Sequence, residues 1–288
     1  MKLETGVSLS NFSTLGIGGA ARFFVSVKTL EDLKEAFSFI RKEKVRFLMV
    51  GRGSNLLFDD RGFDGIVIHN KMEGFSIEGK RVRAEGGAGL PSIGRESVEK
   101  NLSGLEFAAG IPASVGGAIC MNAGASGSSV SAVLESVSFL TLNGELKQFL
   151  KEDLKFDYRF SSLNGEGGAI VGATFLLEEN LKAKEIMEKM MEYRKATQPY
   201  KERSAGCIFK NPKNGSAGYL IEKCGLKGKQ IGGAKVSEIH ANFLINAGGA
   251  SSEDMKNLIA HVKEEVLQKS QVNLSHEVIY VPYQSGVR

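Results

Sequence analysis

The stretch GIPASVGGAICMNAGASG, residues 110–127, contains five glycines among small side chains and no charged residue. A segment of this composition exposes main-chain N–H groups and leaves room for a flat, bulky ligand against the backbone. A tightly packed helix corner with turns would have the same composition. For this segment in isolation the packed corner is the better interpretation.

A second glycine-containing loop, GRGSNLL at residues 51–57, follows the apolar strand expected at residues 47–50. Two glycines allow a tight turn at the strand end, and a Ser and an Asn add polar groups suited to a pyrophosphate. The loop lacks the Gly-Lys-Ser/Thr of a Walker loop and the third Gly of the Rossmann fingerprint. An ordinary turn is the alternative. If both loops belong to one domain, together they favour a bound dinucleotide.

Charge and cysteine content exclude several classes of protein. The 37 basic and 33 acidic residues leave a net charge of +4, so we expect no nucleic-acid partner. The three cysteines are odd in number and lack metal-ligand spacing, so no metal site is expected. The N-terminal residues 1–10 contain no apolar signal core, which favours the cytoplasm. Residues 107–134 are uncharged, but their Gly, Ser and Pro content makes a membrane span a poor interpretation.

Hydrophobic periodicity predicts a mixed α+β chain that is rich in strands. Thr29 is the expected N-cap of a helix that ends near residue 43, and Pro91 is expected to open another. Asn143-Gly144 predicts a type I′ turn in a hairpin over residues 136–149. The other expected strands are 22–27, 47–50, 65–69 and 168–177, with a hairpin through 77–85; the other expected helices are 181–196, 216–224 and 252–269. The last of these helices is expected to carry one apolar side, made of Met255, Leu258, Ile259, Val262, Val266 and Leu267. The composition shifts to a charged helix after the strand at 168–177, and this helix is the predicted domain boundary.

Three side chains could carry chemistry, each with a structural alternative. Arg159 of DYRFS can bind a carboxylate, or its stem can cover apolar surface. Cys207 of RSAGCIFKNP can donate a proton or act as a nucleophile, although a buried inert thiol is the commoner case. Glu277 precedes the strand VIYV, where a carboxylate is usually just solvated. Cys120 and Cys224 are expected to be structural.

Seven segments occur in one order that resembles the UDP-N-acetylenolpyruvoylglucosamine reductases, in the shorter type II branch of that family. They are NFSTLGIGGAARFF, GRGSNLL, GIPASVGGAICMNAGASG, DYRFS, SAGCIFKNP, GLKGKQIGGAKVSEIHANFLIN and HEV, and they span nearly the whole chain. The resemblance implies an α+β fold with a two-part FAD-binding domain of the vanillyl-alcohol-oxidase type at residues 1–180. A smaller α+β substrate-binding domain would follow at residues 181–288.

The resemblance also implies an activity in peptidoglycan precursor synthesis, and hence a role in cell-wall formation, cell shape and division. NADPH would reduce noncovalent FAD, which would then reduce UDP-N-acetylglucosamine enolpyruvate to UDP-N-acetylmuramate. The enzyme would be a cytoplasmic monomer.

The same resemblance assigns residues to roles. Arg159 and Glu277 would stabilise the enol-like intermediate, and Cys207 would be the proton donor, where many relatives carry Ser. Serine-histidine at 275–276 stands where relatives often have a proline-containing turn. Residues expected to hold FAD are Gly51, Gly53, Ser54, Asn55, Leu56, Gly110, Ile111, Pro112, Ser114, Gly116, Gly117, Asn122, Ala123 and Gly124. Residues expected to contact the sugar nucleotide are Lys210, Asn211, Ser237, His240 and Asn242.

Overall fold

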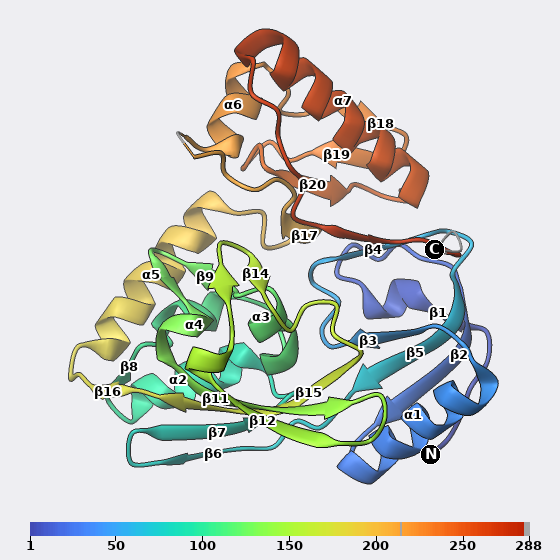
Figure 1. Cartoon of the computed structure of the whole chain (residues 1–288). Coiled ribbons are helices and arrows are strands. Elements are labelled where there is room, and N and C mark those ends of the chain that lie inside the picture. The colour runs from blue at the N-terminus through green and yellow to red at the C-terminus, as the bar shows by residue number, and fades with distance from the viewer. Residues whose placement is uncertain (214, 285–288) are drawn as a thin grey trace. The chain divides into compact units, whose positions relative to one another are not determined.

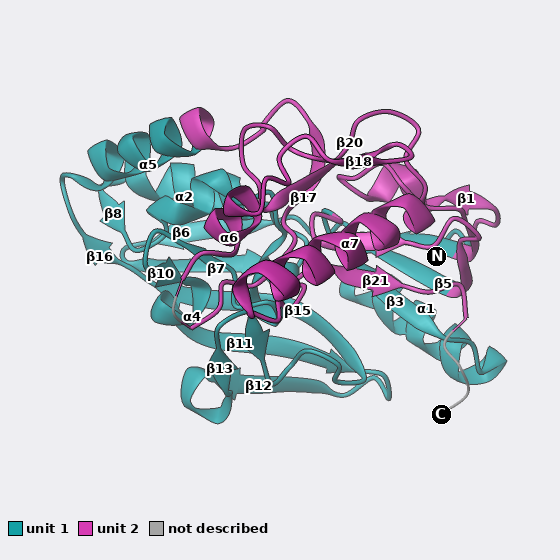
Figure 2. Ribbon diagram, turned by 90° about the horizontal axis from the view of Figure 1, so that it is seen from above, with its two compact units in different colours: residues 1–3, 24–52, 66–194 teal, residues 4–23, 53–65, 195–288 magenta. Residues whose placement is uncertain are grey.

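The computed structural model describes residues 1–213 and 215–284 (Figure 1). The chain forms two compact units, each assembled from separate segments of the sequence (Figure 2). Unit 1 comprises Met1–Leu3, Phe24–Arg52 and Ile66–Arg194, and unit 2 comprises Glu4–Phe23, Gly53–Gly65 and Lys195–Arg288. The expected mixture of helices and strands is confirmed, whereas the predicted domain boundary between residues 180 and 181 stays a prediction.

Unit 1 is built on an antiparallel five-stranded sheet of order β12-β11-β15-β7-β6. Its strands are β6 (Phe75–Glu78), β7 (Arg81–Glu85), β11 (Leu134–Thr141), β12 (Leu146–Leu150) and β15 (Gly168–Leu176). In the same unit, β3 (Phe47–Val50) pairs in parallel with residues 66–69 of β5 (Phe63–Asn70). The helices are α1 (Leu30–Glu43), α2 (Leu90–Glu99), α3 (Val115–Cys120), α4 (Val130–Val133) and, up to Arg194, α5 (Ala183–Thr197). The shorter elements are β8 (Leu102–Ser103), β9 (Gly124–Ala125), β10 (Ser128–Ser129), β13 (Phe156–Asp157), β14 (Phe160–Ser161), β16 (Glu178–Glu179), η2 (Glu106–Gly110) and η3 (Lys151–Asp153).

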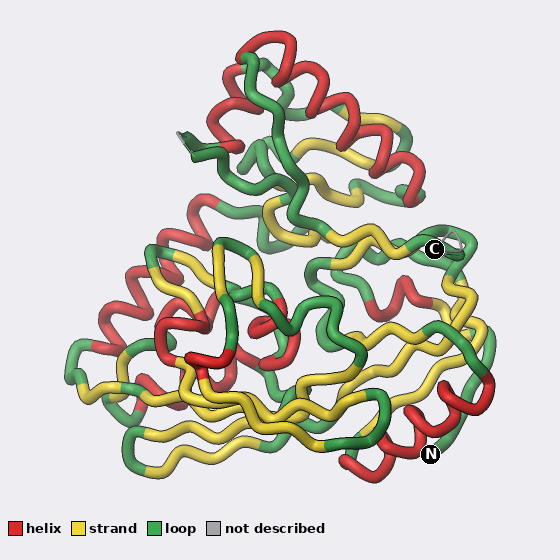
Figure 3. The backbone as a smooth tube through the Cα atoms, viewed as in Figure 1, coloured by secondary structure: helices red, strands yellow, loops and turns green. Residues whose placement is uncertain are grey.

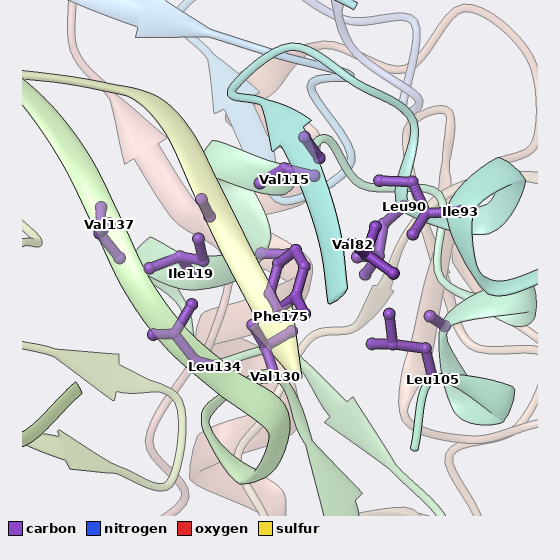
Figure 4. Close-up of a cluster of buried hydrophobic side chains, with 14 of the residues drawn as sticks. Val82, Leu90, Ile93, Leu105, Val115, Ile119, Val130, Leu134, Val137 and Phe175 are labelled. Carbon is purple, nitrogen blue, oxygen red and sulfur yellow. The ribbon is translucent and has the colours of Figure 1, made fainter. Parts of the chain in front are cut away.

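Apolar side chains of α2, α3 and the five-stranded sheet form the core of unit 1 (Figure 4). Val82, Val137 and Phe175 come from three strands, and all three are completely buried. Ile93 of α2 and Ile119 of α3 pack in the same cluster. Each such side chain contributes roughly 1.5–3 kcal/mol by leaving water. This core fixes α3, and with it the glycine-rich segment.

Local sequence signals set the helix starts in unit 1. Thr29 Oγ1 accepts a hydrogen bond from the Asp32 N–H, and the Asp32 carboxylate accepts one from the Thr29 N–H, so the expected cap is a complete capping box. Pro91 lies in the first turn of α2, as predicted.

The hairpin of β11 and β12 is confirmed, but its predicted turn type is wrong. Gly144 has a φ of 89°, whereas Asn143 does not adopt a positive φ, which a type I′ turn requires at both positions. The Gly144 N–H donates to the Thr141 carbonyl, and the Thr141 N–H donates to the Glu145 carbonyl. The loop therefore has three residues, with glycine in the left-handed position.

Unit 2 contains a four-stranded antiparallel sheet of order β17-β20-β19-β18. Its strands are β17 (Arg203–Cys207), β18 (Gln230–Ile231), β19 (Ala234–Val236) and β20 (Phe243–Asn246). The unit also contains α6 (Ala217–Lys223), α7 (Ser252–Ser270), β1 (Val7–Ser8) and η1 (Leu9–Phe12), and β2 (Ala20–Val27) begins in it. A second, parallel pair joins β4 (Leu56–Phe58) to β21 (Ile279–Val281), and loops connect most of these elements (Figure 3).

Helix α7 packs one side on the core of unit 2. Met255, Leu258, Val262 and Val266 are buried there, as the periodicity predicts. Leu267 was also expected on this side, but its side chain is 47% exposed, so that expectation is wrong. It directly follows Val266, and adjacent helical positions point about 100° apart.

No helix in the described part of the chain is both long and apolar enough to cross a membrane. Within residues 1–213 and 215–284, no group of three or more His, Cys, Asp and Glu side chains is arranged to hold a metal ion.

Candidate active site

Gly51 and Ser114 bring the two glycine-containing segments together in unit 1. A Cβ atom on Gly51 would lie 2.1 Å from the Ser114 Oγ and 2.9 Å from its Cβ. Ser114 is buried, and its Oγ accepts a hydrogen bond from the Gly117 N–H at the start of α3. The first loop thus begins directly against the second segment, which is the arrangement that favours a dinucleotide.

The N-terminal N–H groups of α3 are already occupied by protein acceptors. Val115 donates to the Ala88 carbonyl at 2.9 Å, Gly116 to the Gly86 carbonyl at 2.8 Å, and Gly117 to Ser114. A Cβ on Gly116 would lie 3.1 Å from that Gly86 oxygen. Gly116 therefore allows close packing of α3, as the packed-corner alternative expects, and its assignment to FAD stays a prediction.

The ends of the glycine-rich segment are held by side chains of unit 1. Arg194 Nη2 of α5 donates to the Gly110 carbonyl at 2.7 Å, just before Ile111 and Pro112. Asn122 adopts a φ of 40°, and its amide bonds the Asp157 carbonyl and the Ser131 N–H. Ala123 and Gly124 follow, and Gly124 opens β9. Arg194 was not assigned a role from the sequence, because nothing in its own segment signals a contact 84 residues away.

Arg159 lies at the tip of the hairpin formed by β13 and β14 in unit 1. Its φ is 57°, in the left-handed region that costs a non-glycine residue about 1–2 kcal/mol. The guanidinium donates to the Gly124 carbonyl at 3.1 Å and stacks over the ring of Tyr158 at 5.0 Å. Strained residues are often found at functional sites, where surrounding contacts hold them.

In unit 2, the loop before β4 presents main-chain donors. The N–H groups of Gly53, Ser54 and Asn55 donate to no described residue. Gly53 has a φ of 62°, and a Cβ there would lie 1.8 Å from the Phe12 carbonyl oxygen, so only glycine fits. Ser54 and Asn55 are only partly exposed, where unpaired N–H groups are costly without a partner. Three consecutive free donors before Leu56 suit a phosphate oxygen.

Cys207 ends β17 at an irregularity in the sheet. The pairing of β17 with β20 shifts register between Ser204 and Cys207, and Gly206 has a φ of 76°. A Cβ on Gly206 would meet nothing within 4 Å. Such bulges often redirect a side chain next to an active site. Cys207 and Cys120 are both half-buried, and burial raises the pKa of the Cys120 thiol to about 11, which suits a structural role.

The segment that follows Cys207 runs antiparallel to the segment that carries Glu277. Phe209 bridges His276, the Glu277 N–H donates to the Ile208 carbonyl at 2.7 Å, and the Lys210 N–H donates to the Ser275 carbonyl. Unit 2 thus brings the Cys207 and Glu277 backbones together, although 70 residues separate them in the chain.

Asn242 holds this segment from the other side. Its Oδ1 accepts from the Phe209 N–H and its Nδ2 donates to the Phe209 carbonyl, both at 2.9 Å. The side chain is 2% exposed, and its two hydrogen bonds pair with the Phe209 main chain as a neighbouring strand would. Asn242 was expected to contact the sugar nucleotide, but these bonds leave its amide engaged with the protein backbone.

The other residues expected to contact the sugar nucleotide have different surroundings. The Lys210 ammonium has no ion-pair partner among the described residues, whereas Asn211 Oδ1 accepts from the Ala217 N–H. Ser237 is completely buried and donates to Glu202. His240 Nδ1 accepts from the Asn242 N–H, and burial lowers the pKa of its imidazole, so this ring is neutral near pH 7.

Comparison with known proteins identifies the family. Residues 198–281 match the model of the UDP-N-acetylenolpyruvoylglucosamine reductase C-terminal domain, and residues 21–149 match that of an FAD binding domain. The chain is 44% identical over 281 residues to the UDP-N-acetylenolpyruvoylglucosamine reductase of Protochlamydia amoebophila, covering 97% of this chain and 94% of that protein.

The chain belongs to the UDP-N-acetylenolpyruvoylglucosamine reductase family. The reductase of Bacillus subtilis is 42% identical over 282 residues, with 96% of this chain and 93% of that protein covered. The crystal structure of the Thermus caldophilus reductase superposes with a TM-score of 0.86 at 36% identity, covering 98% and 100% of the two chains. These matches confirm the predicted family, the FAD-binding fold and the classification as an FAD-dependent oxidoreductase.

The residues present fit an FAD. In unit 2, the free N–H groups of Gly53, Ser54 and Asn55 offer a cradle of donors to a pyrophosphate. In unit 1, the N-terminal N–H groups of α3 donate to protein acceptors instead.

Proposed function

We propose that this chain reduces the enolpyruvyl group of UDP-N-acetylglucosamine enolpyruvate to give UDP-N-acetylmuramate, with NADPH as the source of electrons and noncovalent FAD as their carrier. The proposal includes a role in peptidoglycan precursor synthesis in the cytoplasm, and a monomeric enzyme with an FAD-binding domain over residues 1–180 and a substrate-binding domain over 181–288.

One observation carries the proposal beyond family membership. The antiparallel contact of residues 208–210 with residues 275–277 brings the thiol-bearing and carboxylate-bearing segments of unit 2 side by side. Hydride addition to the terminal vinyl carbon builds negative charge on the carboxylate side of the substrate, and this charge must be stabilised. A proton donor must then reach the other vinyl carbon. Two adjacent segments with those two functional groups meet this need.

Bound FAD would supply the hydride to the terminal vinyl carbon. The Cys207 thiol would give its proton to the other vinyl carbon, and Glu277 would stabilise the enol form through a hydrogen bond. Arg159 would offset the negative charge on the carboxylate side of the substrate. A thiol, with a reference pKa of about 8.5, is a far stronger acid than a serine hydroxyl and so can replace it as donor.

Contacts with the sugar nucleotide would come from Lys210 and Asn211, next to Cys207 in the chain. The Lys210 ammonium has no ion-pair partner in the described part of the chain and so remains available to a diphosphate, which supports this role. Ser237, His240 and Asn242 would line the pocket or support it from behind.

The test uses purified holoenzyme under anaerobic conditions. NADPH should bleach the flavin absorbance, and UDP-N-acetylglucosamine enolpyruvate should then restore it, with UDP-N-acetylmuramate as the product. Protein that is colourless and takes up no flavin would contradict the proposal, as would reduced flavin that the enolpyruvyl substrate does not reoxidise.

A further inference from the structure

Asn55 joins the cofactor loop of unit 2 to the segment that carries Glu277. Its side-chain Nδ2 donates to the Glu277 carbonyl at 3.2 Å, and its main-chain carbonyl accepts from the Ile279 N–H at 3.0 Å. The two bonds lie on either side of Val278, so one residue holds the chain just after Glu277 at two points.

The Glu277 backbone is therefore held from two directions. Its N–H donates to the Ile208 carbonyl on the Cys207 side, and its carbonyl accepts from Asn55 on the cofactor-loop side. Of these two hydrogen bonds, only the one from Asn55 is donated by a side chain. A substitution at position 55 can therefore remove it without changing the main chain.

Asn55 also belongs to the cradle of free donors. Its own N–H is the last of the three that have no acceptor among the described residues, while its side-chain donor points to Glu277 instead. The residue thus has separate groups for the two tasks: the main-chain N–H can serve a phosphate, and the amide serves Glu277.

We propose that Asn55 is a positioning residue for Glu277, and that its carboxamide sets the placement of this carboxylate for the reduction of substrate rather than the affinity for FAD. The inference rests on the proposed function, in which Glu277 acts on the enolpyruvyl substrate. A displacement of about 1 Å at a reacting group can lower a rate about 100-fold, so a single hydrogen bond at this point is enough to matter.

The test compares Asn55→Ala with Asn246→Ala. Asn246 is a matched control because its Nδ2 also bonds a carbonyl far away in the chain, that of Leu15 at 2.9 Å, in the same unit. Both variants are compared after full loading with FAD, and for Asn55→Ala any change in bleaching by NADPH should be smaller than the change in reoxidation. Reoxidation by the enolpyruvyl substrate should slow by about 10-fold to 100-fold. Asn246→Ala should reoxidise at the wild-type rate once folded and loaded.

A double-mutant cycle and hydrogen exchange locate the effect. If Asn55 acts through Glu277, adding Asn55→Ala to Glu277→Gln should slow reoxidation little further. In the Asn55→Ala holoenzyme, the Glu277 amide should exchange about tenfold faster than in wild type. If Asn55→Ala fails to fold, Asn55→Ser is tested in its place, since its shorter side chain cannot reach the carbonyl.

Three results would overturn the inference: reoxidation at the wild-type rate, additive effects in the cycle, or a loss of FAD affinity that accounts for the whole defect. The last would make Asn55 a cofactor ligand through its side chain. Failure of the proposed function itself is distinguishable, because the wild-type enzyme would then also fail to be reoxidised by the substrate.

Discussion

Gly51 lies so close to Ser114 that a Cβ atom at position 51 would approach the Ser114 Oγ to 2.1 Å. Gly51 does not have a positive φ, so its backbone conformation is open to any residue. Position 51 therefore needs glycine only because there is no room for a Cβ atom where the first loop packs against Ser114 of the glycine-rich segment.

The Gly51→Ala variant should therefore separate the two segments. We expect a loss of about 1–3 kcal/mol in the free energy of unfolding, from overpacking, and weaker binding of FAD to the apoprotein. Urea unfolding and flavin titration measure the two effects. Gly167→Ala is the control, because a Cβ there would meet nothing within 4 Å. In the Gly51→Ala background, adding Ser114→Gly should recover part of the lost FAD affinity. If Gly51→Ala and Gly167→Ala have the same stability and the same FAD affinity, space at position 51 is not limiting.

Arg159→Gly should separate stability from activity. Glycine relieves the left-handed strain at φ 57° while the bond to Gly124 is lost, so the free energy of unfolding should stay within about 1 kcal/mol of wild type. Reoxidation of the flavin by the enolpyruvyl substrate should nevertheless fall by about 100-fold or more. Lys44→Gly, at a helix C-cap with φ 52°, is the control and should be fully active. An active Arg159→Gly enzyme would exclude the proposed role.

Asn242→Leu should destabilise the protein through Phe209. The change leaves the buried Phe209 N–H and carbonyl without their partner, and each unpaired group costs about 1–3 kcal/mol. We expect a total loss of about 2–5 kcal/mol in urea unfolding, against almost none for Asn273→Leu on the exposed surface. A small effect at position 242 would mean that its amide is not a structural clamp.

Asp59 should make stability depend on pH at the acid end. Hydrogen bonds from Arg61 are the main cause that lowers the pKa of this buried carboxyl, and the Tyr280 hydroxyl also donates to it at 2.6 Å. Because the pKa of Asp59 is lower in the folded than in the unfolded protein, its carboxylate stabilises the fold fully above the unfolded-state pKa of about 3.9. This stabilisation is lost as the pH falls below that value towards the folded-state pKa.

The Asp59→Asn variant should accordingly lose about 1–3 kcal/mol at pH 7, and its deficit should shrink below about pH 4. Urea unfolding across this range, with the exposed Glu166→Gln as control, measures the difference. A deficit that stays constant down to about pH 2 would mean that the charge of the Asp59 carboxylate is not what stabilises the fold.

Local signals in the sequence were sufficient for the longer helices and for several of the longer strands of the fold. The Thr29 capping box, Pro91 and the apolar spacing of Met255, Leu258 and Val262 depend on residues within one or two turns, and each is confirmed. The turn at Asn143-Gly144 was predicted in place but not in type. The flanking strands decide whether two or three residues form the loop, and their register is set by pairing across the whole sheet.

Contacts between distant segments could not be predicted in the same way. The pairing of β4 with β21 and the bond from Asn55 to Glu277 join residues more than 200 positions apart, and no local pattern signals either. The same holds for Asn242, whose place in VSEIHANF suggested a ligand contact while its amide bonds Phe209. The candidate catalytic residues came from the family resemblance, since Cys207 taken alone favoured packing.

The most direct test of the central claim compares Cys207→Ala with Cys207→Ser in the two half-reactions. NADPH should bleach the flavin of both variants at the wild-type rate. Anaerobic reoxidation by UDP-N-acetylglucosamine enolpyruvate should then retain much of its rate in Cys207→Ser, whose hydroxyl can still donate a proton, and fall by at least about 100-fold in Cys207→Ala. Normal reoxidation of the alanine variant would show that the proton comes from another group and that Cys207 is only packed against its neighbours.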